Sequence, residues 1–245
     1  DSLRAEVHRE LRGADLTRIR RQALDNLNEA GLSTTLVVTL KKGLNDGEIG
    51  EIIDFALQQP CVRGVTLQPI QDAGRVEDYD PRLHRLTVSE IRRRIAEQSR
   101  LFTLEDVVPV PCNPDTLAMA YAIKTEEGTV PLTRWLDPQT LVEGSGNTIV
   151  FERDPALHGA VKDRIFQLFS TNHSPESQAN CLSELMCCLP LVSAPSALRY
   201  DNVFRVLIVQ FMDAYSLDVR ALKKSCIHFA LPDGRLVPFE SYNLL

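Results

Sequence analysis

Residues 34–70 read TTLVVTLKKGLNDGEIGEIIDFALQQPCVRGVTLQPI, and this stretch decides the fold. Its first seven residues, 34–40, are short, apolar and rich in β-branched side chains, which is typical of a buried strand. Residues 46–57 repeat apolar side chains at helical spacing, and Pro60 ends that helix. Residues 64–70 then form a second apolar run, which we expect to be the next strand.

A further helix precedes this unit. Residues 15–30 are amphipathic at helical spacing, so the order is helix, strand, helix, strand. A helical crossover of this length joins parallel strands in a right-handed sense. The sequence therefore predicts an α/β fold, with ligands beyond the carboxyl ends of the two strands, in loops 39–45 and 68–75.

The remainder of the chain has a different pattern, which predicts an α+β region. We expect a capping box at Thr87 to open a helix, and a hairpin over residues 121–133. Helices are expected from Asp154 and from Ser174. An apolar stripe over 200–211 predicts another helix, and residues 226–239 predict a second hairpin. We divide the chain at this change of pattern, into regions 1–85 and 86–245.

Composition argues against several classes. Twenty-seven basic and 33 acidic residues give a net charge of −6, which argues against a nucleic-acid-binding protein. No apolar run approaches the ~20 residues of a membrane span, and the charged first 30 residues do not have the pattern of a signal peptide. We expect a cytoplasmic protein without nucleic-acid partners.

Cysteine is the main chemical signal among the side chains. Six are present, and no CxxC motif occurs, so metal ligation or reduced thiols are favoured over disulfides. Cys112 follows a rigid Pro-Val-Pro stretch, and it is either a soft metal ligand or a small buried hydrophobe. Cys187 and Cys188 are adjacent, so we expect one of the two to ligate. Cys226 lies between a basic helix end and a strand, whereas Cys61 is expected to be structural.

Several motifs together resemble a known family. These are HRELRG at 8–13, the strand–helix–strand stretch quoted above, PVPCNPD at 109–115, CCLP at 187–190 and GRLVPFESYN at 234–243. They resemble the radical S-adenosylmethionine (radical SAM) superfamily over nearly the whole chain. The nearest branch holds archaeal tetraether lipid synthase and the methanopterin-modifying methylase.

The resemblance implies the last strands and helices of a (β/α) partial barrel. It implies a [4Fe-4S] cluster that cleaves S-adenosylmethionine to a 5′-deoxyadenosyl radical. A reductant protein would supply the electron to this cluster. It also implies auxiliary clusters, and a lipid-like or small-molecule cofactor substrate that is alkylated or coupled at unactivated carbons. The family's CxxxCxxC motif is absent from these residues, so we expect the later part of a longer enzyme, inactive alone.

The resemblance also implies site residues. The auxiliary-cluster ligands would be Cys112, Cys226 and Cys187 or Cys188. Thr39 and Asn45 would face the ribose or carboxylate of S-adenosylmethionine, and Gln68 and Pro69 its adenine. Arg75 would either pair with a carboxylate or lie on the surface.

Two alternatives fit the same residues. The chain could be an auxiliary iron–sulfur module for electron transfer, or a structural α/β domain whose cysteines are merely buried. If the chain is the later part of a longer protein, we expect strand 34–40 to have an open edge, through which the chain would self-associate or which it would pair with another segment.

Overall fold

A computed structural model describes residues 1–72, 79–110, 113–125, 128–134, 138, 202–223, 225 and 227–242. Its helices are α1 Ala5–Arg12, α2 Thr17–Glu29, α3 Ile49–Gln58, α4 Pro81–His84, α5 Val88–Gln98, η1 Leu132–Arg134, α9 Val219–Leu222 and α10 Phe239–Tyr242. Its strands are β1 Thr34–Leu40, β2 Val62–Pro69, β3 Val108–Pro109, β4 Leu117–Thr125, β5 Gly128–Pro131, β6 Val203–Val209, β7 His228–Ala230 and β8 Leu236–Pro238. No helix in these ranges is long and apolar enough to cross a bilayer.

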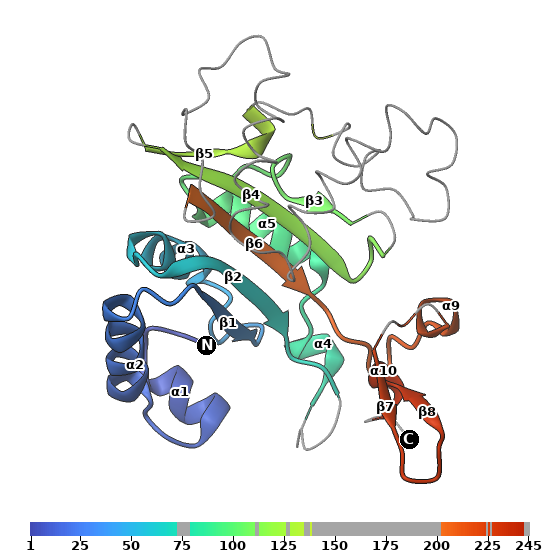
Figure 1. Cartoon of the computed structure of the whole chain (residues 1–245). Coiled ribbons are helices and arrows are strands. Elements are labelled where there is room, and N and C mark those ends of the chain that lie inside the picture. Colours follow the sequence, from blue (N-terminus) through green and yellow to red (C-terminus); the bar gives the residue numbers. More distant parts are fainter. Residues whose placement is uncertain are drawn as a thin grey trace.

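A six-stranded mixed sheet forms the centre (Figure 1). Its order is β1-β2-β6-β4-β3, with β5 also paired to β4. The pairs β1–β2 and β2–β6 are parallel, whereas β4 is antiparallel to β3, β5 and β6. All the strands of this sheet except β4 therefore point the same way. The α/β fold class is confirmed; closure into a partial barrel stays a proposal.

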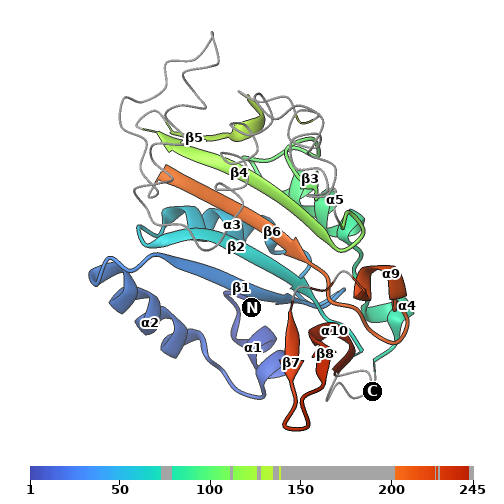
Figure 2. The ribbon, with the colours of Figure 1, turned by 45° about the vertical axis from the view of Figure 1, so that its right-hand side comes forward.

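The two faces of the sheet differ because side chains alternate along each strand. One face carries the core: Leu40 on β1, Leu67 on β2 and Ile208 on β6 are fully buried. This face packs against apolar residues of α3 and α5, which lie behind the sheet in Figure 2. The opposite face, which we call the second face, carries more polar side chains.

Local sequence signals account for much of this. The strand predicted at 34–40 has those bounds, and Thr87 and Glu90 form the predicted capping box. The helix predicted over 15–30 is α2, and the hairpin predicted over 121–133 is β4–β5. The helices expected from Asp154 and Ser174 lie outside the described residues.

The prediction of a helix over residues 200–211 is wrong, because residues 203–209 form strand β6. Its burial alternates with period two, and it pairs with β2 on one side and β4 on the other. Most of its residues are β-branched or aromatic, which favours a strand once neighbours are available. The central sheet thus contains strands from both predicted regions, 1–85 and 86–245.

The predicted C-terminal hairpin is β7–β8. Aromatic rings hold it together: Phe229 lies 5.5 Å from Phe239 and 4.5 Å from Tyr242, centre to centre. Phe239 also lies 5.7 Å from Phe211, which follows β6. This ring contact ties the hairpin to the end of the sheet.

Candidate functional site at the carboxyl edge of the sheet

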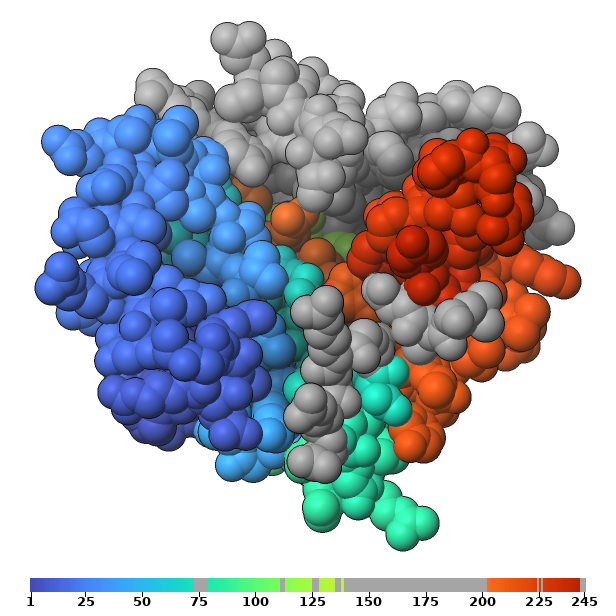
Figure 3. Space-filling view, turned by 90° about the horizontal axis from the view of Figure 1, so that it is seen from below, coloured from blue at the N-terminus to red at the C-terminus, as the bar shows by residue number. Residues whose placement is uncertain are grey.

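Strands β1, β2 and β6 end at the same edge of the sheet, at Leu40, Pro69 and Val209. Figure 3 views the molecule from below, with the N-terminal helices in blue on one side and the C-terminal segment in red on the other. The surface between them is recessed. Ligands of parallel sheets bind beyond the carboxyl ends of the strands, so this edge is the expected location of a site.

The structure brings two predicted residues together here. Thr39 and Gln68 are partners in the β1–β2 register and lie on the second face. Thr66 lies beside them on β2, and Arg205 of β6 is the register partner of Gly64 on the same face. The side chains of Gln68, Thr66 and Arg205 make no hydrogen bond within the described part of the chain. Their polar groups can therefore contact a ligand.

The side chain of Asn45, the next predicted residue, is held by hydrogen bonds to backbone groups of the same chain. Its side chain is fully buried, and its amide nitrogen donates to the carbonyl oxygens of Asp1 at 2.9 Å and Thr39 at 2.8 Å. Its amide oxygen accepts from the backbone N–H of Lys41 at 2.9 Å. All three bonds fix the loop after β1, so its geometry is that of a structural residue.

Thr39 is also partly engaged. Its hydroxyl accepts from Arg12 at 2.8 Å, and Arg12 forms a two-pronged pair with the Asp1 carboxylate, both bonds at 2.7 Å. Arg20 lies 2.7 Å from the same carboxylate. Two guanidinium groups on one buried carboxylate position the end of β1 rigidly, because charge-assisted paired bonds are strong and directional.

A second cluster lies where β6 ends. Asp213 is fully buried, and its two carboxylate oxygens accept from one nitrogen of Arg85 at 2.6 and 2.8 Å. It also accepts from the Ser216 hydroxyl at 2.8 Å and from the Asp72 backbone at 3.2 Å. Burial alone raises the pKa of Asp213, but the bonds from Arg85 and Ser216 outweigh it and hold the pKa below its ordinary value.

Aromatic rings border this ion pair. Tyr79 lies 5.9 Å from His84 and 6.4 Å from Tyr215, and the Arg85 guanidinium lies 5.7 Å from the centre of the Tyr215 ring. Burial raises the pKa of Tyr79 by more than the nearby Arg85 lowers it, so the hydroxyl is protonated at neutral pH. The neighbourhood therefore combines flat apolar faces with a fixed charge pair.

Polar atoms without hydrogen-bond partners gather at the same edge. Among the described residues, buried side-chain atoms of Gln71, Arg85 and Gln210 make no hydrogen bond, and the Tyr79 hydroxyl, although close to Arg85, makes none of good geometry. Each such atom costs roughly 1–3 kcal/mol when left unpaired. A bound ligand that offers both donors and acceptors would supply the missing partners, which favours this edge as a binding site.

The remaining predicted residues are one at this edge, one in the core, and five outside the described residues. Pro69 is the last residue of β2, and its carbonyl accepts from Gln71 at 3.5 Å. Cys61 is buried in the core, as predicted for a structural cysteine. The part of the chain that the structure describes holds no group of three or more potential metal-ligating side chains. Five predicted site residues lie outside the described residues: Arg75 and the cluster ligands Cys112, Cys187, Cys188 and Cys226.

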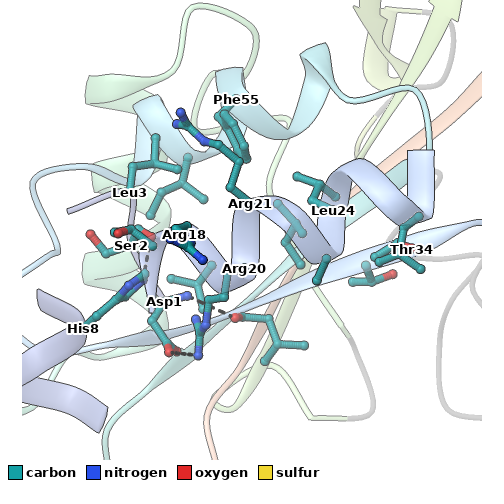
Figure 4. A pocket seen from close by; sticks show the side chains of 18 of the residues that line it. Asp1, Ser2, Leu3, His8, Arg18, Arg20, Arg21, Leu24, Thr34 and Phe55 are labelled. Atoms are coloured by element: carbon teal, nitrogen blue, oxygen red, sulfur yellow. Dashed lines mark hydrogen bonds and ion pairs between the residues drawn. The ribbon is translucent and has the colours of Figure 1, made fainter. Parts of the chain in front are cut away.

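A separate pocket of about 680 Å³ opens along the outer edge of β1 (Figure 4). Residues 34–38 of β1 form one wall, α2 forms another, and Ile52 and Phe55 of α3 close it. His8 lines it as well, with its Nδ1 atom unpartnered among the described residues. Asp1 also lines it and accepts from the backbone N–H of Thr39, so the pocket adjoins the carboxyl edge there.

Sequence reasoning missed Arg85, Asp213 and Arg205. Asp213 and Arg205 depend on β6, whose sequence suggested a helix. With 203–209 interpreted as a strand, Asp213 would stand just beyond a strand's carboxyl end. Arg85 carries no local signal, because its partner is 128 residues away.

The fold defines an α/β protein with a candidate site at the carboxyl edge of its central sheet. No family model matches the chain. It is 29% identical, over 96% of its length, to 7,8-dihydro-6-hydroxymethylpterin dimethyltransferase of Methanocaldococcus jannaschii. The aligned region covers 53% of that protein, so the chain spans about half the length of this relative.

Proposed function

We propose that this chain is part of a methyltransferase of the radical SAM type that acts on a small pterin-like substrate. The observation that carries the proposal is the similarity to a pterin dimethyltransferase along nearly the whole chain. The carboxyl edge supports it, because free polar atoms and aromatic rings there suit a flat heterocycle with hydrogen-bonding groups. The parallel strands β1, β2 and β6 would then belong to the partial barrel of such an enzyme.

The residues of the second face fit a polar cofactor such as S-adenosylmethionine. Gln68 offers an amide and Thr66 a hydroxyl, and Arg205 offers a guanidinium that pairs with a carboxylate. None of these side chains is committed to a bond within the described residues. Thr39 remains one of the proposed cofactor-binding residues, although its hydroxyl also accepts a hydrogen bond from Arg12. Asn45 would contribute indirectly, because its side chain fixes the loop after β1.

The cysteines supply the chemistry for a cluster. Thiolates are the ligands of iron–sulfur clusters, and we propose Cys112, Cys226 and one of Cys187 and Cys188 as ligands. These cysteines would hold an auxiliary cluster, whereas the cluster that cleaves S-adenosylmethionine would be bound by the CxxxCxxC motif that these residues lack. The chain's own residues would bind and orient the substrate at the carboxyl edge. A cytoplasmic location and a reductant protein as partner belong to the same proposal.

The first test is iron and acid-labile sulfide on anaerobically reconstituted chain. We expect about four of each per chain. Cys112→Ala or Cys226→Ala should abolish the cluster absorption, whereas Cys61→Ala serves as the matched control and should keep it. Iron that survives both substitutions, or that never binds, contradicts the ligand set.

The second test addresses the substrate. Because this chain lacks the CxxxCxxC motif, we expect it alone to leave 7,8-dihydro-6-hydroxymethylpterin unchanged in the presence of S-adenosylmethionine and dithionite. A longer protein that holds the motif should give a pterin heavier by one or two methyl groups. The same measurement on the longer natural protein shows whether residues beyond this chain are needed. A loaded longer protein that leaves the pterin unchanged contradicts the proposed substrate class. An iron-loaded chain whose longer form transfers no methyl group would favour the electron-transfer alternative.

A further inference from the structure

Two glutamines at the carboxyl edge each have a buried amide oxygen that accepts no hydrogen bond from the described residues. We propose that these residues, Gln71 and Gln210, determine specificity for a pterin, an inference that rests on the proposed function. Their amide oxygens accept from the 2-amino group and the N3–H of the pterin. The Arg85 Nε–H donates to its 4-oxo oxygen, and the Tyr215 ring stacks on its face.

The burial of Gln71 is the first observation. The residue is 7% exposed, and its amide nitrogen makes only a long contact, 3.5 Å, with the Pro69 carbonyl oxygen. No donor in the described part of the chain reaches its amide oxygen, and the same is true of the amide oxygen of Gln210. A buried acceptor without a donor lowers the stability of the folded chain. Two such acceptors at one edge favour donors supplied by a bound molecule.

The two glutamines belong to neighbouring strand ends. Gln210 directly follows β6, and Gln71 lies two residues after β2. These strands are parallel neighbours, with Leu67 opposite Ile208. The same register continued by two residues places Pro69 opposite Gln210. Gln71 is then one diagonal step from Gln210, roughly 7–8 Å between backbones, which is within the span of one bicyclic ring.

The buried Asp213 carboxylate holds the other two groups at the same place. It accepts from the backbone N–H of Asp72, next to Gln71, at 3.2 Å and from that of Tyr215 at 3.0 Å. Its two oxygens also bind one terminal nitrogen of Arg85, at 2.6 and 2.8 Å. The Arg85 Nε–H remains buried, without an acceptor in the described part of the chain. The edge therefore presents two free acceptors and one free donor.

The Tyr215 ring supplies a flat apolar face next to these polar groups. It is 57% exposed, and its centre lies 5.7 Å from the Arg85 guanidinium and 6.4 Å from the Tyr79 ring. An aromatic ring with one side held by protein and the other open is suited to stacking on a flat ligand. Few precisely placed polar groups beside such a ring are what fixes the orientation of a small ligand.

A pterin has the complementary pattern on its pyrimidine ring. Its 2-amino group and N3–H are donors and its 4-oxo oxygen is an acceptor, in that order along one edge. Two amide oxygens and one guanidinium N–H match this donor–donor–acceptor order. The reduced carbons and the hydroxymethyl group of 7,8-dihydro-6-hydroxymethylpterin belong to the other ring, so this mode of binding leaves them clear of the two glutamines.

The experiment measures ligand binding and stability on the same variants. Anaerobic titration calorimetry compares 7,8-dihydro-6-hydroxymethylpterin with its lumazine analogue, which has a 2-oxo group in place of the 2-amino group. The titrations use this chain and a longer protein that holds the CxxxCxxC motif, and the variants are made in whichever binds the pterin. We expect Gln71→Met and Gln210→Met each to weaken pterin binding about tenfold. Both should leave the urea midpoint unchanged or raise it, because each removes an unpaired buried oxygen.

Two further variants serve as controls. Gln71→Glu keeps acceptor oxygens and has no amide N–H, so it should retain pterin binding and reject the lumazine. Gln58→Met changes an exposed glutamine at the end of α3 that leads into the start of β2, away from the carboxyl edge. It should alter neither binding nor the urea midpoint.

Each result decides the proposal. Weaker pterin binding in both methionine variants, with the fold at least as stable, supports it. Pterin binding that both variants retain overturns it and leaves the proposed substrate class standing. Weaker binding together with a lower urea midpoint also overturns it, because the glutamines would then be structural. If neither the chain nor the longer protein binds the pterin, the proposed substrate class itself fails, and this inference fails with it.

Discussion

The buried pair between Arg85 and Asp213 gives the sharpest prediction. Asp213 has no exposure, and the side chain of Arg85 is 20% exposed. Arg85→Met keeps much of the volume and removes the charge, which leaves a buried carboxylate without its counter-ion. Breaking a buried pair in this way costs about 3–5 kcal/mol. We expect the lower end, because Asp213 retains its bonds from Ser216 and from two backbone N–H groups.

The measurement is urea unfolding followed by circular dichroism. A loss of about 3 kcal/mol is a large share of a typical stability of about 5–15 kcal/mol. The double variant Arg85→Met with Asp213→Leu should recover much of the loss, since it removes both charges. Arg220→Met at the exposed pair with Asp218 is the matched control and should change nothing measurable. A single-variant loss below about 1 kcal/mol, or additive losses in the double variant, would refute the reasoning.

The same pair predicts the response to acid. The folded pKa of Asp213 is lowered, so its stabilising contribution is complete above the unfolded pKa of about 3.9 and is lost as pH falls through the folded value. Below about pH 4 the wild-type chain should therefore lose stability faster than Asp213→Asn. Parallel acid curves for the two proteins would contradict this assignment.

Single contacts give three further predictions. In Gly64→Ala the added Cβ would lie against the Arg205 carbonyl oxygen, so β2 and β6 must separate, and we expect a clear drop in melting temperature. The control Gly47→Ala, whose added Cβ would have open space around it, should not show this drop. Asn45→Ala should cost about 2–3 kcal/mol in urea unfolding, because its loop loses three buried bonds; a neutral result would free Asn45 for a ligand role. Arg205→Met should leave the unfolding midpoint in place and weaken S-adenosylmethionine binding in equilibrium dialysis; unchanged binding would remove Arg205 from the site.

Local sequence patterns are enough to define the individual elements. The β-branched run at 34–40, the helical periodicity after it and the capping box at Thr87 each depend on residues within a few positions of one another. Order along the chain then makes β1 and β2 parallel neighbours, which places Thr39 beside Gln68. The α/β class and the carboxyl edge as the place for a site follow from the same local information.

Contacts between distant segments are set by the three-dimensional arrangement alone. Residues 203–209 are nearly all apolar, and a short apolar run fits a helix face or a strand interior equally well. The edges of β2 and β4 resolve this ambiguity, because their backbone groups are satisfied only by a strand between them. With β6 in place, Asp213 meets Arg85 across 128 residues, and Arg205 joins the second face. No local sequence pattern predicts these long-range contacts, because they arise from the pairing of strands that are far apart in the chain.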